Sequence, residues 1–91
     1  MKFPKWVENP AQSPQKIKSN RLLHYVNVAA THHHKSGSIS LLAKEIGFSR
    51  AAIYAAIQQG EMSIGMASAI ELAVGADVVS REMLCPKKSE Q

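Results

Sequence analysis

Six residues between positions 49 and 58 have side chains suited to contact DNA bases: Ser49, Arg50, Ala51, Tyr54, Ala55 and Gln58. At helical spacing they share the face opposite Ile53 and Ile57. The Arg50 guanidinium can bond a guanine edge at two atoms or hold a phosphate, and both contacts stay open. Tyr54 and Gln58 can bond bases or phosphates, and the alanine methyl groups can touch thymine. The alternative is an ordinary solvent-exposed helix face, but this face lacks the Glu and Lys residues that such faces usually carry.

Four residues just before this face are candidates for contacts with DNA phosphates: Ser38, Ser40, Lys35 and Lys44. Ser38 and Ser40 stand where a helix is predicted to start, and its N–H groups and positive dipole end can bind a phosphate. Lys35 and Lys44 add positive charge close by in the chain. The alternative for each lysine is a plain solvated charge.

The segment 39–58, ISLLAKEIGFSRAAIYAAIQ, predicts the frame that positions these side chains. Ala43 is small where a second helix would cross the first. Gly47, four residues later, suits a turn with positive φ. Ile53 and Ile57 lie one helical turn apart and would anchor the second helix to the core. This pattern indicates a helix-turn-helix, the unit that places one helix in the DNA major groove.

Serine, proline and glycine mark the limits of the helices expected around this unit. The predicted helices are Arg21–His34, Ser38–Ile46, Ser49–Gln59, Ser63–Val74 and Arg81–Leu84. The first helix starts either at Ser13-Pro14 or near Asn20, and the sequence leaves both open. We therefore expect an all-α fold with four to five short helices around one core, and little or no strand.

The domain organisation expected from the sequence has three parts. Residues 1–19 form a flexible basic N-terminal arm, residues 20–86 the helix-turn-helix domain, and residues 87–91 a polar tail. Proline punctuation and polar composition distinguish the arm. Within it, Phe3 and Trp6 either pack on the domain surface or dock onto a partner or DNA, and packing is the preferred interpretation.

The charge of the chain is unevenly distributed. The 91 residues carry a net charge of +4. Residues 1–60 hold eight Lys or Arg against two acids, whereas residues 61–91 hold three against five. A basic half that contains the helix-turn-helix suits a polyanion and predicts salt-dependent binding. Many small soluble domains are mildly basic, so charge alone does not establish this function.

Metal and disulfide chemistry are not expected. One cysteine, Cys85, excludes an internal disulfide and a multi-cysteine zinc site, and it is expected to be semi-buried. His32, His33 and His34 are consecutive, and successive helical residues point about 100° apart, so they cannot all face one ion. His24 is distant in sequence. The histidines are instead expected to stabilise the C-terminus of the helix when they are charged, because a cation there faces the negative end of the helix dipole.

No catalytic or targeting pattern is visible in the chain. The sequence has no Ser/His/Asp pattern, phosphate loop or spaced carboxylate pair, so we expect no enzyme activity and no cofactor. No apolar run approaches the about 20 residues of a membrane span. The N-terminus has no signal-peptide core. Together with the single cysteine, this predicts a cytoplasmic protein, associated with the nucleoid when bound to DNA.

Two stretches resemble known families. Residues 39–58 are similar to the helix-turn-helix of the phage repressor superfamily, the lambda Cro and repressor proteins, through Ala43, Gly47 and Ile53. Residues 62–86 and the preceding glycine resemble the YdaS-like branch of Cro-type regulators. The matching pieces are Gly60, Ile64, Ala69-Ile70-Glu71 and Leu84-Cys85-Pro86.

The resemblance implies a five-helix, lambda-repressor-like domain from a bacterium or prophage. It implies a homodimer on a two-fold symmetric double-stranded operator, repression near its own gene, and base contacts from Ser49, Arg50, Ala51, Tyr54 and Ala55. Some relatives are labelled antitoxins and have a small protein partner encoded nearby. The chain departs from the pattern at Ile39, where many relatives have glutamine, and at Cys85, where arginine is common. A tryptophan common near the end of the branch's second motif helix is also absent.

The sequence therefore leaves two functions open, and the first is the preferred one. The first is a sequence-specific DNA-binding repressor with residues 49–59 in the major groove. The alternative is an antitoxin or anti-factor that acts mainly by binding a protein. For that alternative, four residues form the expected adaptable surface: Met62, Met66, Ala69 and Met83.

Overall fold

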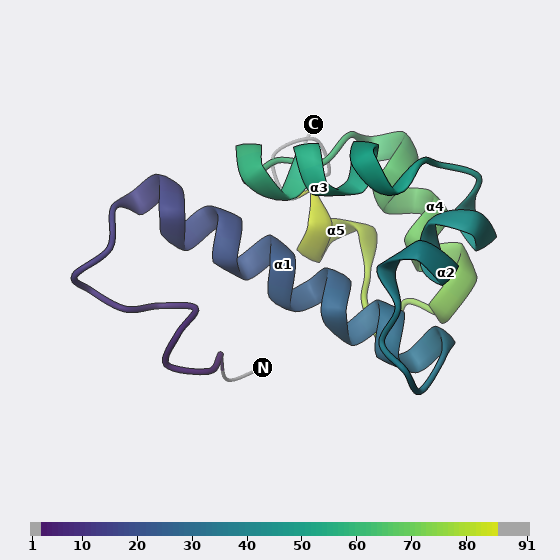
Figure 1. Ribbon diagram of the computed structural model, residues 1–91, viewed down its shortest axis with the longest axis horizontal. Coiled ribbons are helices and arrows are strands. Elements are labelled where there is room, and N and C mark those ends of the chain that lie inside the picture. The colour runs from purple at the N-terminus through teal and green to yellow at the C-terminus, as the bar shows by residue number, and fades with distance from the viewer. Residues whose placement is uncertain (1–2, 86–91) are drawn as a thin grey trace.

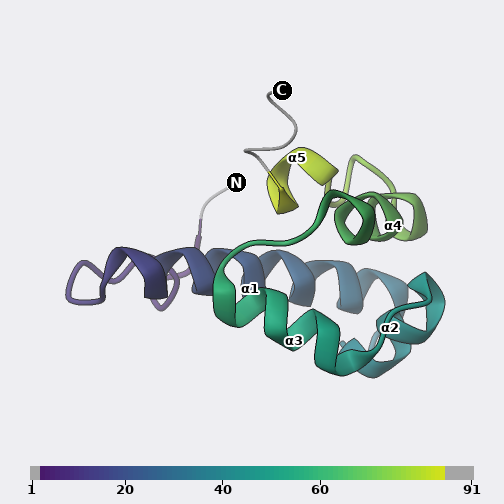
Figure 2. The ribbon, with the colours of Figure 1, turned by 90° about the horizontal axis from the view of Figure 1, so that it is seen from above.

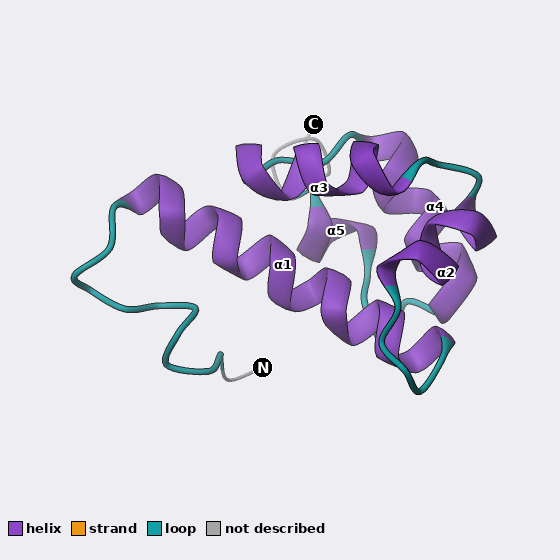
Figure 3. Cartoon of the chain, in the orientation of Figure 1, coloured by secondary structure: helices purple, strands orange, loops and turns teal. Residues whose placement is uncertain are grey.

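The computed structural model describes residues 3–85, and they form an all-α domain (Figure 1). The helices are α1 (Pro14–His33), α2 (Ile39–Ile46), α3 (Arg50–Gln59), α4 (Ile64–Val74) and α5 (Arg81–Leu84). Short loops connect them, and the described residues contain no strand (Figure 3). The predicted all-α class with four to five helices is confirmed, although α1, with 20 residues, is longer than the short helices expected.

A serine stands immediately before each of the five helices. In every case its side-chain oxygen accepts a hydrogen bond from the backbone N–H three residues later, which satisfies one of the free donors of the first turn. The capping residues are Ser13, Ser38, Ser49, Ser63 and Ser80. Because capping is a local interaction, the sequence predicted four of these starts directly, and Ser13 decides between the two starts considered for the first helix.

Helix α1 is the long central element of the fold. It has 20 residues and contacts each of the other four helices. Leu22, Val26, Ala29 and Ala30 are buried along one side of it. Seen from above, α3 and α4 flank α1 (Figure 2), whereas in the view of Figure 1 both lie on the same side of it. The core is thus built around α1, and α3 and α4 each expose an outer face.

The segment before α1 packs onto that helix. Val7 is fully buried, although the core residues expected from periodicity all lie later in the chain. The buried Asn20 amide donates hydrogen bonds to the Trp6 carbonyl at 3.0 Å and to the Gln12 side chain at 2.9 Å. The Phe3 ring, half-buried, meets the Tyr25 ring edge-on at 5.4 Å. These contacts agree with packing as the role of Phe3.

The expected division into an arm of residues 1–19 and a domain of residues 20–86 differs from the structure. α1 begins at Pro14, so the boundary at residue 20 falls inside a continuous helix. Arg21 also pairs with Glu8 of the preceding segment at 3.0 Å. The difference arises because the sequence showed the arm's polar composition but not the contacts that hold it. Pro86 and the tail predicted at residues 87–91 lie outside the described residues.

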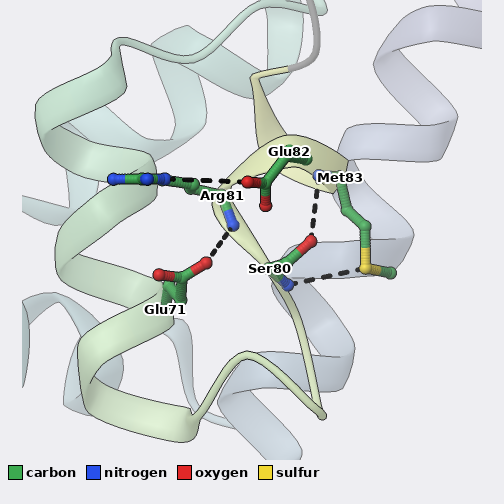
Figure 4. Close-up of polar contacts among 5 residues, drawn as sticks. All are labelled: Glu71, Ser80, Arg81, Glu82 and Met83. Carbon is green, nitrogen blue, oxygen red and sulfur yellow. Dashed lines mark hydrogen bonds and ion pairs between the residues drawn. The ribbon is translucent and has the colours of Figure 1, made fainter. Parts of the chain in front are cut away.

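The short helix α5 is linked to α4 by one hydrogen bond, and two more bonds lie within its own first turn (Figure 4). The backbone N–H of Arg81 donates to a Glu71 carboxylate oxygen at 2.8 Å. The Ser80 hydroxyl accepts from Met83 N–H at 3.4 Å, and Ser80 N–H lies 3.5 Å from the Met83 sulfur. A carboxylate at a helix N-terminus is favourable, because it accepts a free N–H and faces the positive dipole end. Glu71 therefore links the last two helices.

Candidate nucleic-acid interface

A three-residue turn, Gly47 to Ser49, connects α2 to α3. Gly47 has φ +76°, in the left-handed region that glycine adopts at little cost. The N–H groups of Gly47 and Phe48 both donate to the Ala43 carbonyl. The Ser49 hydroxyl then accepts from Ala52 N–H at 3.0 Å and starts α3. The geometry predicted for Gly47 is confirmed, and the turn sets the direction of α3.

Helix α3 has one buried side and one exposed side. Ile53 is fully buried and Ile57 is 5% exposed, so both anchor the helix as predicted. The six residues predicted to contact bases are all exposed: Ser49, Arg50, Ala51, Tyr54, Ala55 and Gln58. We call this set the α3 outer face. The structure brings all six together on one helix and its cap.

A contact within the α3 outer face was not anticipated from the sequence. The guanidinium carbon of Arg50 lies 5.6 Å from the centre of the Tyr54 ring. A guanidinium at this distance is attracted by the electron-rich face of the ring. The two residues are four apart in a helix, and this spacing was the signal that could have predicted their contact. The ring therefore restrains the cation near the N-terminal end of α3.

The electrostatics of the α3 outer face are those of an unneutralised cation. Helix α3 contains no acidic residue. The ion pairs found within residues 3–85 join Arg21 to Glu8 and Arg81 to Glu82, and neither involves α2 or α3. Arg50 is thus a positive charge held by an aromatic ring instead of by a carboxylate, and it can meet an anionic ligand without first breaking an ion pair.

The four predicted phosphate-binding residues lie on α2 or in the loop before it. Lys35, Ser40 and Lys44 are exposed. Ser38 is half-buried, and its hydroxyl accepts a hydrogen bond from Leu41 N–H at 3.2 Å. The hydroxyl of Ser38 is therefore already used as the α2 cap.

The surface expected for a protein partner is not present as predicted. Met62 is 2% exposed and Met66 is 5% exposed, so both belong to the hydrophobic core. Ala69 and Met83 are half-buried. Met66 shares the buried side of α4 with Ile70, and periodicity carried the signal that these side chains point inward. The expectation of a methionine surface is wrong for Met62 and Met66.

Cys85 and the histidines show no chemical site. Cys85 forms no disulfide within the described residues and is buried, more deeply than expected. His34 follows α1, and its Nδ1 lies 2.7 Å from the Ser36 hydroxyl. Within residues 3–85, no group of three or more His, Cys, Asp or Glu side chains could hold a metal ion. None of the helices described is both long and apolar enough to cross a membrane.

A groove of about 650 Å³ lies between the N-terminal segment, α1, the α3–α4 connection and α5. Leu22, Tyr25 and Met83 contribute apolar surface to it, and Glu8 and Arg21 lie beside them as an ion pair. Burial raises the pKa of the Tyr25 hydroxyl above its ordinary value, although the nearby Arg21 charge opposes this shift. These residues do not form a nucleophile–base pair, and the groove is separate from the α3 outer face.

The chain was compared with protein-family models, with curated proteins and with solved structures, and none of the three comparisons gave a match.

Proposed function

We propose that the protein is a sequence-specific DNA-binding regulator that inserts α3 into the major groove. The observation that carries this proposal is the α3 outer face. It presents Arg50, Tyr54 and Gln58 among small alanines, has no acidic residue, and follows a three-residue turn. Small side chains let a helix lie deep in a groove, and arginine and glutamine have the donors that base edges recognise.

In this function each part of the interface has a separate task. Arg50, at the first position of α3, bonds a guanine edge. Tyr54 and Gln58 follow on the same face, one helical turn apart. The α2 N-terminus, with Lys35, Ser40 and Lys44, contacts phosphates and fixes the orientation of α3. A short reading surface gains specificity from a second copy, so the proposed operator is two-fold symmetric and bound by a homodimer.

The regulator would act as a repressor, because a protein bound across an operator blocks access to the same DNA. The proposal includes no enzymatic step and no cofactor. Residues 1–60 are basic, which supports rapid association with DNA. The alternative function is an antitoxin or anti-factor that acts mainly by binding a partner protein.

The decisive experiment is selection of bound duplexes from a random DNA pool by the full chain. We expect enrichment of a palindromic duplex, and the protein's affinity for it should fall steeply as the salt concentration rises. The logarithm of the association constant should decrease with the logarithm of salt concentration by about 0.9 for each phosphate neutralised. Protein that is folded but enriches no sequence would contradict the proposal and favour a protein-binding function.

A matched pair of variants tests whether α3 carries the binding. Ala55→Glu places a carboxylate on the α3 outer face, and Ala11→Glu makes the same change at an exposed alanine of the N-terminal segment. We expect Ala55→Glu to abolish binding to the selected duplex and Ala11→Glu to retain most of it. Equal losses would show that only overall charge matters.

A further inference from the structure

The outer face of α4 is uncharged and carries the most exposed of the large apolar side chains described. Leu72 is 89% exposed, whereas the next, Trp6, is 45% exposed. The buried side of α4 faces the core through Met66, Ala67, Ile70 and Val74. Opposite it, at helical spacing, lie four residues that we call the α4 outer face: Gly65, Ser68, Ala69 and Leu72. A surface helix normally carries charged residues there.

Nothing in the fold of a single chain explains why residue 65 is a glycine. Its φ is not positive, and a Cβ atom built on it would meet no atom within 4 Å. Glycine within a helix is less favourable than alanine, so an open position with ordinary helical geometry does not call for it. Close approach by another backbone does call for it, because only glycine leaves that space free.

We propose that the α4 outer face docks a second copy of this chain through antiparallel pairing of the two α4 helices. Residues 65 and 72 are equally far from the midpoint between Ser68 and Ala69. A two-fold axis through that midpoint places Leu72 of each copy over Gly65 of the other, and Ser68 against Ala69. The projecting leucine then fills the space that the glycine leaves, and the contact is self-complementary, as two-fold symmetry requires.

Charge favours a second copy as the occupant. In a two-fold contact the same surface is used on both sides, so a charge near the axis would meet its own copy. The chain carries a net charge of +4, which makes two copies repel in most orientations. Glu71, the acidic residue of α4, lies at the edge of the face and is bonded to Arg81 N–H. The four residues of the α4 outer face thus bring no like charges together when two copies meet there.

The position of α4 leaves α3 available to DNA. Helices α3 and α4 flank α1 in the view of Figure 2 and their outer faces share no residue, so docking on the α4 outer face does not use the α3 outer face. The inference rests on the proposed function only in assigning this dimer to a two-fold operator.

The test is the oligomeric state of the full chain in sedimentation experiments without DNA. The variant is Leu72→Glu, and the control is Leu41→Glu, the same change at an exposed leucine of α2. We expect the natural sequence and the control to be dimeric at micromolar concentration. We expect Leu72→Glu to be monomeric with an unchanged helical circular dichroism spectrum, because burying its carboxylate opposes association.

A second variant, Gly65→Ala, has two expected effects of opposite direction. The added methyl group stabilises the helix of an isolated chain, so the melting temperature of dilute protein does not fall. The same methyl group meets Leu72 of the second copy, so the dimer dissociation constant rises by about tenfold or more. A loss of both folding and pairing would contradict this account of Gly65.

The outcomes separate this inference from the proposed function. A chain that is monomeric at all concentrations, or a Leu72→Glu variant that stays dimeric, overturns the α4 interface. If the dimer depends on Leu72 but no DNA sequence is enriched, the interface stands and the proposed function fails. If a palindrome is bound by a dimer that Leu72→Glu does not disrupt, the function stands and the interface fails.

Discussion

Helices α3 and α4 have similar buried sides and contrasting outer faces. Both are short, with 10 and 11 residues, and both begin after a serine cap. Each is anchored by a fully buried isoleucine, Ile53 in α3 and Ile70 in α4. The α3 outer face is cationic and polar, whereas the α4 outer face is uncharged, with small residues around the exposed Leu72. The buried side of each helix therefore sets where the helix lies, and under our proposals the outer face selects its partner.

The two outer faces suit ligands of different chemistry. The Arg50 charge favours binding to a polyanion, because contact between a cation and phosphates releases counterions. A second copy of a basic chain instead favours a face without charge, such as that around Leu72. Under our proposals the chain separates the two contacts, so that DNA and the second copy do not compete for one surface.

The largest expected effect tests whether the two buried sides are equivalent. Ile53→Ala and Ile70→Ala each remove a fully buried side chain. Each should lower the free energy of unfolding by about 2–5 kcal/mol, through lost apolar burial and the cavity left behind. Urea denaturation measures this. Leu72→Ala is the control and, in a sample dilute enough to be monomeric, should change the value by no more than about 0.5 kcal/mol. If only one of the two isoleucine variants is destabilised, the buried sides of α3 and α4 are not equivalent.

The next effect concerns the α3 outer face alone. Arg50→Ala should weaken affinity for the selected operator by about 1–3 kcal/mol, because a guanidinium contact to a base edge is lost. The free energy of unfolding should stay nearly constant, since Arg50 is exposed. Arg81→Ala, which removes the same charge from α5, is the matched control. Fluorescence anisotropy with labelled duplex measures both variants, and equal weakening would remove Arg50 from the base-reading role.

The smallest expected effect concerns one glycine from each region, Gly47 in the turn before α3 and Gly65 in α4. Gly47→Ala forces an alanine to φ +76° and should cost about 1–2 kcal/mol of stability. Gly65→Ala has ordinary helical geometry and open space, so it should cost nothing in a dilute, monomeric sample. Thermal unfolding of both variants checks this. If both are destabilised alike, Gly65 has a role within the single chain and its assignment to a dimer contact weakens.

Helix limits were largely predictable because they depend on neighbours in sequence. Ser38, Ser49, Ser63 and Ser80 each cap a helix from within three residues, and Gly47 ends α2 in the predicted left-handed geometry. Helical periodicity likewise predicted the burial of the isoleucines of α3. These features arise from local hydrogen bonds and from one repeating angle, and the sequence records both.

Contacts across the fold were the part that sequence analysis missed. Val7 is buried because the N-terminal segment returns along α1, and Asn20 holds that segment through its amide. Met62 is buried in the connection between α3 and α4, where no periodicity applies. Each placement depends on a segment distant in the chain, so composition led to a flexible arm and a methionine surface instead.

The all-α class, the order of the helices and the composition of the α3 outer face follow from the sequence, because caps, turns and periodicity act within a few residues. The position of the N-terminal segment on α1 depends instead on tertiary contacts. Tertiary structure also left Leu72 uncovered while it buried Met62 and Met66. The physical reason is that the burial of a side chain depends on which distant segments reach it, and packing of the whole chain sets that.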